Sequence, residues 1–463
     1  MIPHVLFKVL TLCIHYMNDL SNLIRNSSTL VIDVERGESF RGGDKSRIVT
    51  IPHESNIVCV GSWKVLLVDN TISFCAYLFE LIDMDSNIVL VPRNIMDSIF
   101  TNVVEYLQQN QPEQKCQLGL LTSGTTGTPK IVIHSFDRLH SKILANRREN
   151  GFDASFKNIL CSLPLSFGHG LIGNFFTFIG IAEKIYIVDN SIKTLSNVID
   201  LCNQKNIHFF SSVPSMWGII ATAKEGFQQE IHIGLGSELA SEQLFRSIIS
   251  MGAKSVTNFY GLTEMSNWIG TRCATSMGNI ECLFSDGYPI FKLYSGTKVK
   301  IIQDAENGSR LTNFKEVRGE LALMHPTMFL TYLGRNNRTE DVYYPTGDVV
   351  EWIRENERVI RLIGRAQNYV NRGGVRIHLN EIDSCLNERF GELNFISLAS
   401  QLGQTTKITT FICSDRPDAE NVVRGWVDEN IQASHRPDQL KRVKTVPVTA
   451  RGKIDYKALK SLI

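Results

Sequence analysis

The chain has 463 residues, which is long enough for two or three domains rather than one ordinary core. Its hydrophobic fraction of 43% and charged fraction of 21% are those of a globular protein. The formal net charge of +1 gives no electrostatic bias toward nucleic acid or an anionic membrane, so neither is expected as a partner.

The cysteines and the N-terminal segment indicate where in the cell the protein is expected. Ten cysteines are scattered without any Cys-x-x-Cys pair, so zinc is not expected and a cytoplasmic location is favoured. The apolar stretch Val5–Met17 is interrupted by Lys8 and His15, and no small-residue cleavage site follows it. It predicts a helix or an extension upstream of a start at Met17, with a weak signal peptide as the alternative. No apolar run reaches the roughly 18 residues of a membrane span.

Short apolar runs alternate with helical patterns through the first two-thirds of the chain. Alternation of this kind predicts an α/β fold with parallel sheets covered by helices. Ser73–Leu81 is a predicted helix, and the predicted strands are Ile57–Val60, Leu66–Val68, Ile88–Val91, Ile159–Leu163, Ile185–Val188, His208–Ser211, Ile231–Leu235 and Ser255–Phe259.

The pattern changes in the last third. Lys298–Leu323 is strand-rich with polar turns and predicts a smaller antiparallel or barrel-like subdomain. Val349–Ile353 and Val359–Ile363 predict a hairpin around a polar turn. After Arg365 the pattern becomes α+β, which predicts an N-terminal domain over 1–365 and a C-terminal domain over 366–463.

A polar loop, Thr122–Lys130, lies between two apolar strands. Leu118–Leu121 ends one predicted strand and Ile131–Ile133 begins the next. Glycine N–H groups can approach an anion closely, Ser and Thr hydroxyls can donate to it, and the closing lysine adds positive charge. This chemistry suits a polyphosphate, although the spacing is not that of a Walker A loop, and a surface turn is the alternative.

Further motifs with suitable chemistry follow this loop. In Tyr260–Glu264 an aromatic ring could stack on a base, a threonine could bond a phosphate and a carboxylate could hold Mg²⁺. Asp348 could accept from two vicinal hydroxyls of a ribose. Arg365 adds a guanidinium, and Lys453 lies on a glycine turn near the C-terminus. Taken singly, each is explained better as a core tyrosine, a capping aspartate or a solvated lysine.

Taken together and in this order, the motifs closely resemble the adenylate-forming, or AMP-binding, superfamily, from about Ser55 to the C-terminus. Its members include acyl- and aryl-CoA synthetases, adenylation domains of peptide synthetases and beetle luciferases. The resemblance implies a large domain of helix-covered parallel sheets with a small barrel-like subdomain, followed by a mobile α+β lid.

The resemblance also implies residue roles. Tyr260 would stack on adenine, Asp348 would bind the ribose, and Arg365 would lie near the ribose and phosphates. Thr263 would meet the α-phosphate, and Glu264 would hold Mg²⁺. The β- and γ-phosphates of ATP fall to the loop, namely Thr122, Ser123, Gly124, Thr125, Thr126, Gly127 and Lys130. Lys453 would bridge the acyl carboxylate and the α-phosphate, whereas Gly319–Leu321 and Tyr332 match a structural motif without chemistry.

The implied reaction has two halves. A carboxylate attacks the α-phosphate of ATP, giving an acyl-adenylate and pyrophosphate, and a thiol then displaces AMP. The lid rotates between the halves about a pivot at Gln367, where most relatives have Asp or Lys. One pose brings in Lys453, and the other brings in Gly374, which lets a pantetheine arm pass, and Arg376, which lies near the CoA nucleotide in some relatives.

The expected acceptor is CoA, and the alternative is the phosphopantetheine of an acyl carrier protein loaded by a free-standing enzyme. A nucleotide-binding pseudoenzyme is the alternative that is not an enzyme. The neutral pivot, Ile131 after Lys130, Asn368 and a short N-terminal region depart from the family pattern.

The candidate acyl pocket comprises Phe167, Gly168, His169, Gly236 and Trp268. Domains that take α-amino acids have Asp where Gly168 falls, and an unpaired α-ammonium group would cost roughly 1–3 kcal/mol or more. A small-molecule carboxylic acid without an α-amino group, of no particular chain length, is therefore favoured. Phe167 and Trp268 suggest an aryl acid, and a long fatty acid remains an alternative. His169 would contact the carboxylate or gate the pocket, with a structural role at a helix start as the alternative.

Overall fold

The computed structural model describes the chain in the ranges 20–41, 57–95, 97–112, 114–122, 130–221, 225–285, 287–302, 318–335, 342–372, 375–391, 393–402, 405–433, 435–448 and 454–463. The apolar stretch Val5–Met17 lies outside them. Within these ranges no helix has the length and apolar character needed to cross a membrane.

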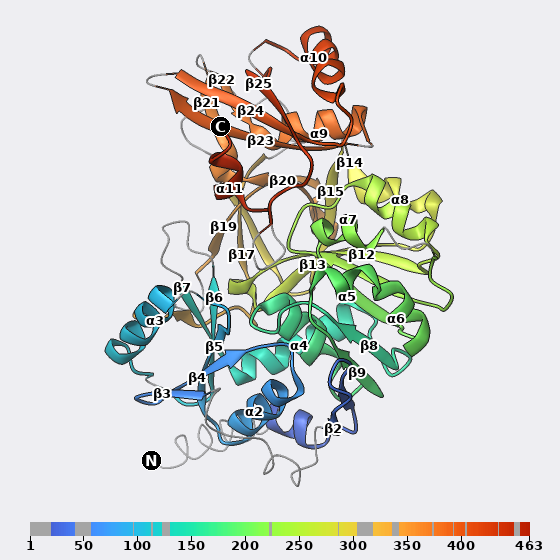
Figure 1. The fold of residues 1–463 in the computed structure, drawn as a ribbon. Helices are drawn as coiled ribbons and strands as arrows, with labels where there is room; N and C mark the ends of the chain where they lie inside the picture. Colours follow the sequence, from blue (N-terminus) through green and yellow to red (C-terminus); the bar gives the residue numbers. More distant parts are fainter. Residues whose placement is uncertain are drawn as a thin grey trace.

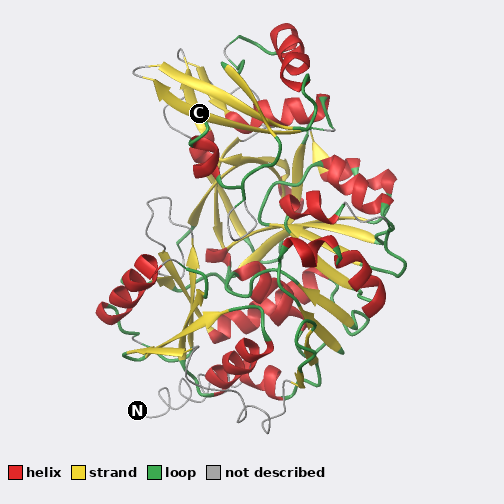
Figure 2. Ribbon diagram, viewed as in Figure 1, coloured by secondary structure: helices red, strands yellow, loops and turns green. Residues whose placement is uncertain are grey.

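Two large sheets form most of the molecule (Figures 1 and 2). The strands of the larger sheet are β1 (Leu30–Asp33), β2 (Ser39–Arg41), β8 (Asn158–Cys161), β9 (Lys184–Ile187), β10 (Phe209–Ser212), β11 (His232–Gly236), β12 (Ser255–Leu262), β13 (Asn267–Ala274), β14 (Phe284–Ser285), β15 (Tyr288–Leu293), β16 (Lys298–Ile302), β17 (Arg318–Met324), β19 (Tyr344–Arg354) and β20 (Val359–Arg365). Those of the second are β3 (Ile57–Val60), β4 (Trp63–Val68), β5 (Asn87–Pro92), β6 (Gln117–Thr122), β7 (Lys130–Ser135) and β18 (Thr331–Tyr332).

Each large sheet contains one block of parallel strands. In the larger sheet β1, β9, β8, β10, β11 and β12 run parallel, and in the second sheet β4, β5 and β6 do. Antiparallel strands continue both sheets, and in the larger sheet they include the predicted hairpin, formed by β19 and β20. In the strand-rich segment predicted to be antiparallel or barrel-like, the described strands β16 and β17 pair antiparallel, and the order β16-β17-β19-β20-β15-β13 joins them to the larger sheet.

Helices pack on these sheets, and their ends follow capping rules. The N-cap of α2 (Ile72–Asp83) is Thr71, whose side chain accepts from the N–H of Phe74. Ser135 caps α4 (Phe136–Asn150) in the same way, and the helix ends at Gly151 with φ of 66°. The other helices are α3 (Asp97–Gln109), α5 (Ile192–Ser196), α6 (Val198–Lys205), α7 (Trp217–Ile220) and α8 (Glu242–Ser250), and a π-helix, η2, spans His169–Phe176.

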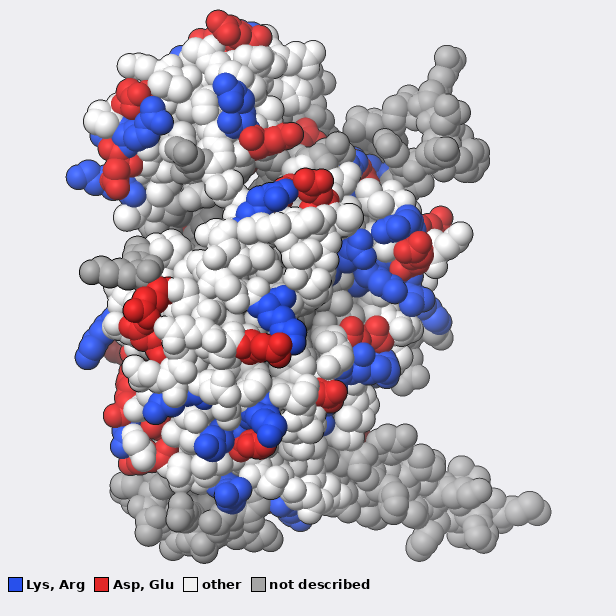
Figure 3. All heavy atoms as spheres, turned by 90° about the vertical axis from the view of Figure 1, so that its right-hand side faces the viewer, with Lys and Arg blue, Asp and Glu red and all other residues white. Residues whose placement is uncertain are grey.

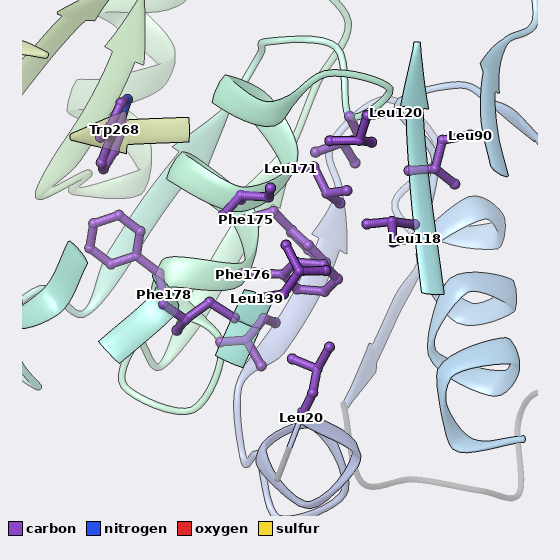
Figure 4. Close-up of a cluster of buried hydrophobic side chains, with 14 of the residues drawn as sticks. Leu20, Leu90, Leu118, Leu120, Leu139, Leu171, Phe175, Phe176, Phe178 and Trp268 are labelled. Carbon is purple, nitrogen blue, oxygen red and sulfur yellow. The ribbon is translucent and has the colours of Figure 1, made fainter. Parts of the chain in front are cut away.

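The main core lies between the two sheets, around η2 and α4. Figure 4 shows leucines of β5 and β6 facing η2, with Leu139 of α4 and Trp268 of β13 in the same cluster. The labelled residues are fully or almost fully buried, namely Leu20, Leu90, Leu118, Leu120, Leu139, Leu171, Phe175, Phe176, Phe178 and Trp268. Burial of this apolar surface is the main stabilising term, and it fixes the two sheets against each other.

Beyond β20 the chain forms separate sheets with their own apolar clusters. The elements are β21 (Tyr369–Arg372), β22 (Val375–His378), α9 (Leu379–Arg389), β23 (Asn394–Leu402), β24 (Thr405–Cys413), α10 (Ala419–Asn430), β25 (Gln439–Val443) and α11 (Tyr456–Lys460). An ion pair of 2.6 Å between Arg318 of β17 and Glu381 of α9 joins this part to the larger sheet. Figure 1 shows it at the top of the molecule, with α11 turned toward the larger sheet.

Charges of both signs are interspersed over the face drawn in Figure 3. Mixing of this kind agrees with the net charge of +1.

Candidate active site

A buried tyrosine, an aspartate and an arginine meet where β12, β19 and β20 come together. The hydroxyl of Tyr260 donates to Oδ2 of Asp348 at 2.6 Å. Nε of Arg365 lies 2.9 Å from the other carboxylate oxygen, Oδ1. Asp348 and Arg365 are direct partners across the β19–β20 ladder, so the sheet register itself sets this pair. Sequence analysis predicted these three residues as nucleotide-binding, and the structure brings them together.

A tight turn presents Asp348. Gly347 has φ of 73°, a conformation that favours glycine, and its N–H donates to Glu320 Oε1 at 3.0 Å. The hydroxyl of Thr346 donates to the carbonyl of Leu321 at 2.8 Å and accepts from the N–H of Asp348 at 3.1 Å. The segment Gly319–Leu321 therefore fixes the turn that carries the aspartate.

A second cluster surrounds Glu264, which follows β12 in a short 3-10 turn. The hydroxyl of Tyr332 donates to Oε1 of Glu264 at 2.7 Å and lies 2.8 Å from the hydroxyl of Tyr344. The backbone N–H of Phe329 donates to the carbonyl of Glu264 at 2.9 Å. Sequence analysis gave Tyr332 no chemistry, and the structure shows that its hydroxyl contacts the predicted Mg²⁺ ligand.

The phosphate-loop strands are adjacent to this cluster. The strand β18, which carries Tyr332, pairs with β7 so that Tyr332 is opposite Val132. Nζ of Lys130, the first residue of β7, lies 5.3 Å from the centroid of the Tyr332 ring. Thr122 and Lys130 are direct partners at the ends of β6 and β7. The two residues that bound the predicted loop thus lie side by side, next to the Glu264 cluster.

Electrostatics link the two clusters. Burial raises the pKa of Asp348, and the Arg365 guanidinium opposes that rise. Asp348 raises the pKa of Arg365, with a smaller contribution from Glu264. Burial and the neighbouring Glu264 also raise the pKa of Tyr332 and Tyr344, so both phenols are protonated donors at neutral pH.

The carboxylate of Glu264 fits an Mg²⁺ ion that arrives with a nucleotide. Mg²⁺ in such sites is held by one or two carboxylates together with phosphate oxygens and waters. Glu264 offers a hard, half-buried carboxylate that is already oriented by Tyr332. In the described ranges no group of three or more His, Cys, Asp or Glu could hold a metal ion by itself. When bound, the ion would neutralise phosphate charge.

The predicted acyl-pocket residues gather at the start of η2. Nε2 of His169 lies 2.8 Å from the hydroxyl of Ser211, and Nδ1 lies 3.0 Å from the hydroxyl of Ser237. Gly236 is adjacent, because a Cβ there would meet Cε1 of His169 at 3.0 Å. Both ring nitrogens of His169 thus have partners. This geometry agrees equally well with the two roles predicted for His169, a structural one and one as a gate of the pocket.

An aromatic stack borders the same region. The rings of Trp268 and Phe259 are parallel, with centroids 3.8 Å apart, and His169 meets Trp268 edge-on at 5.6 Å. Gly173 of η2 permits this packing, since a Cβ there would lie 2.7 Å from Trp268. Trp268 is 2% exposed. It therefore forms part of the wall, and whether it touches an acid stays a prediction.

Several predicted site residues lie outside the described ranges, namely Ser123, Gly124, Thr125, Thr126, Gly127, Gly374 and Lys453. Only the backbone is described at Gln367 and Arg376. Ser211 of β10 and Gly173 of η2 were not predicted as site residues, and Tyr332 was predicted without any chemistry.

Comparison with known proteins identifies the family. The model of the AMP-binding enzyme family matches residues 93–333, which is just over half of the chain. Bacitracin synthase 1 of Bacillus licheniformis is 23% identical over 394 residues, covering 82% of this chain. The acyl-CoA ligase cnsG of Penicillium expansum is 23% identical over 387 residues, covering 77% of this chain and 76% of its own length.

A solved structure has the same fold. The anthranilate CoA ligase AuaEII, in complex with anthranoyl-AMP, superposes with a TM-score of 0.74 at 15% identity, covering 96% of both chains. The present chain spans 7% of the length of bacitracin synthase 1 and 16% of that of a dimodular nonribosomal peptide synthase of Bacillus subtilis. The chain belongs to the AMP-binding enzyme family.

Proposed function

We propose that this protein activates a carboxylic acid with ATP, forming an acyl-adenylate and pyrophosphate, and then transfers the acyl group to the thiol of CoA with release of AMP. The observation that carries the proposal is a pair of polar clusters, one of Lys130, Tyr332 and Glu264 and the other of Tyr260, Asp348 and Arg365, which influence each other electrostatically. The first cluster contains a carboxylate suited to Mg²⁺, with Lys130 over the ring of its tyrosine partner, and the second contains a buried carboxylate suited to ribose hydroxyls.

The proposed residue roles are those that the family resemblance implies. Asp348 accepts from the ribose, and Arg365 and Lys130 face the phosphates. Thr263 meets the α-phosphate. Glu264 holds Mg²⁺, whose charge lowers the repulsion between the acid and the triphosphate. An ionised acid needs no general base. Lys453 completes the adenylation site, and Gly374 and Arg376 belong to the thiol half-reaction.

The acid proposed is one without an α-amino group. Gly168 brings no carboxylate to the start of η2, and His169 is held by two serine hydroxyls. The stacked Trp268 and Phe259 favour a planar acid.

Two bodies are proposed, an adenylation domain over 1–365 and a mobile lid over 366–463 that pivots at Gln367. The separate sheets and apolar clusters beyond β20 support this division.

A carrier-protein phosphopantetheine is the second candidate acceptor, because bacitracin synthase 1 and the dimodular peptide synthase are among the similar proteins. The thioester product formed with CoA alone, compared with the product formed only when a carrier protein is added, decides between the two acceptors.

Acid-dependent exchange of pyrophosphate into ATP tests the proposal, over a panel of aryl, short-chain, long-chain and amino acids. We expect exchange with acids that lack an α-amino group and none with Lys453→Ala. Absence of exchange across the whole panel, despite measurable ATP binding, would favour a nucleotide-binding pseudoenzyme.

A further inference from the structure

The turn that carries Thr263 and Glu264 ends in an unusual backbone conformation. Ser266 has φ of 52° and Asn267 has φ of 91°, so two consecutive residues other than glycine lie in the left-handed region. Such residues are strained, and they persist only where the surroundings hold them. The segment directly after the predicted Mg²⁺ ligand must therefore be held in this conformation by contacts with other residues.

A hydrogen-bonded clamp is present at Ser266. Its hydroxyl donates to the carbonyl of Thr327 at 2.6 Å and lies 2.9 Å from Nδ1 of His134. Both Ser266 and His134 are fully buried. Since the single hydroxyl proton goes to Thr327, the Ser266 oxygen accepts from His134, which must therefore carry its proton on Nδ1.

The surroundings keep this imidazole neutral. Burial, with Arg138 and Lys142 nearby, lowers the pKa of His134 to about 3. Its other nitrogen, Nε2, is buried and has no hydrogen-bond partner among the described residues. A neutral ring with its proton on Nδ1 matches this arrangement, because Nε2 is then an unprotonated acceptor.

The clamp connects the phosphate loop to the metal turn. His134 lies on β7, four residues after Lys130, on the same face of the strand. The carbonyls of Met328 and Phe329, next to Thr327, accept from Arg138 of α4 at 2.9 and 3.0 Å. The strand that follows the phosphate loop is thus hydrogen-bonded, through His134 and Ser266, to the end of the Thr263–Glu264 turn.

We propose that His134 is a positioning residue for MgATP, which acts by donating through Nδ1 to Ser266 and so fixes the Thr263–Glu264 turn relative to the phosphate loop. This inference rests on the proposed function of that turn.

The test compares His134→Leu, Ser266→Ala, the double variant and His134→Asn, whose amide can replace the Nδ1 donor. The first three should weaken ATP binding in the presence of Mg²⁺ about tenfold, the effect of losing one buried hydrogen bond. ATP binding without Mg²⁺ and KM for the acid should change little. The double variant should be no worse than either single one, and His134→Asn should recover most of the loss.

The control is His232→Leu. Nδ1 of His232 on β11 lies 2.7 Å from the hydroxyl of Ser255. Ser255 is the first residue of β12, at the end of that strand opposite to the Thr263–Glu264 turn. We expect this variant to lower only thermal stability. If His134→Leu behaves likewise, with unchanged Mg²⁺ dependence of ATP binding, the inference is wrong. This test measures ATP binding directly, so it does not depend on finding an acid that supports exchange. Absence of exchange with every acid would contradict the proposed function but not this inference.

Discussion

The hydroxyl of Tyr332 donates to the carboxylate of Glu264 at 2.7 Å, although the two residues are 68 positions apart and lie on different elements. The contact forms because the two-residue strand β18 pairs with β7, which carries the ring over to the end of the phosphate loop. The raised pKa keeps the Tyr332 phenol protonated, and its hydrogen bond to the carboxylate is charge-assisted.

Tyr332→Phe should therefore impair MgATP use while leaving the fold intact. A hydrogen bond to a charged group is worth about 1.5–3 kcal/mol, so pyrophosphate exchange should fall by about tenfold to a hundredfold. The change should appear in the dependence on Mg²⁺ and ATP rather than on the acid, measured by exchange kinetics over a matrix of concentrations.

Tyr106→Phe is the matched control, because its hydroxyl donates to the carbonyl of Leu333, one residue further along, at 2.7 Å. Equal losses in the two variants would show that Tyr332 only supports the local backbone.

Asp348→Asn should remove recognition of the ribose. The wild-type protein should favour ATP over 2′,3′-dideoxy-ATP, because the dideoxy nucleotide has no ribose hydroxyls to donate to the buried carboxylate. In the variant this preference should disappear, mainly because the variant uses ATP less well. Competition between ATP and 2′,3′-dideoxy-ATP in the exchange assay measures the preference.

Glu351→Gln serves as the control, since Glu351 lies on the same strand and pairs with Arg361 away from this corner. It should lower stability and keep the nucleotide preference. An Asp348→Asn variant that keeps the preference would contradict the ribose role.

The strands and the nucleotide motifs were predictable because their signals are local. The apolar runs around Thr122–Lys130 predicted β6 and β7, and the order of the motifs predicted that Tyr260, Asp348 and Arg365 act together. β12 continues to Leu262, beyond the predicted end at Phe259, because it pairs with β13 through a bulge at Gly261. A Cβ at Gly261 would lie 2.3 Å from the carbonyl of Asn267, so glycine is required there.

Contacts between distant short segments were not predictable. His169 lies within hydrogen-bond distance of Ser211 on β10, a serine without a motif of its own, and of Ser237 just after β11, in a segment expected to line the pocket. The antiparallel strands that extend both sheets depend on which edges remain unpaired after folding, which periodicity does not report. The clamp of Ser266 by His134 likewise depends on long-range sheet register.

Gly168→Asp should change the preference for acids. Gly168 has φ of −53°, and the nearest atom that a Cβ would meet is Cβ of Asn267 at 3.8 Å, so a side chain fits without strain. The new carboxylate would repel an acid without an α-amino group, and exchange with the best acid should fall by about tenfold or more. Gly218→Asp, at an exposed glycine with open space around it, should leave exchange unchanged. Unaltered acid preference in Gly168→Asp would place the acid elsewhere.

The burial of Lys142 leads us to expect that the free energy of unfolding rises with pH. It is fully buried in α4, Nζ lies 5.0 Å from the centroid of the Tyr294 ring, and burial lowers its pKa to about 7. The unfolded chain, with a lysine pKa near 10.5, binds more protons than the folded protein between about pH 7 and pH 10.5. The free energy of unfolding should therefore increase with pH across that window, by about 1.4 kcal/mol per pH unit from this group.

Lys142→Met keeps most of the side-chain volume and removes the proton. Urea unfolding at pH 6.5, 7.5, 8.5 and 9.5 should show a flatter pH dependence for this variant than for the wild type, and higher stability at the acidic end. Lys254→Met is the control, because Lys254 is exposed and paired with Glu230. If the wild type and Lys142→Met have parallel pH profiles, a water or a proton partner stabilises the charged lysine in the folded protein, and the buried amine does not set the pH dependence.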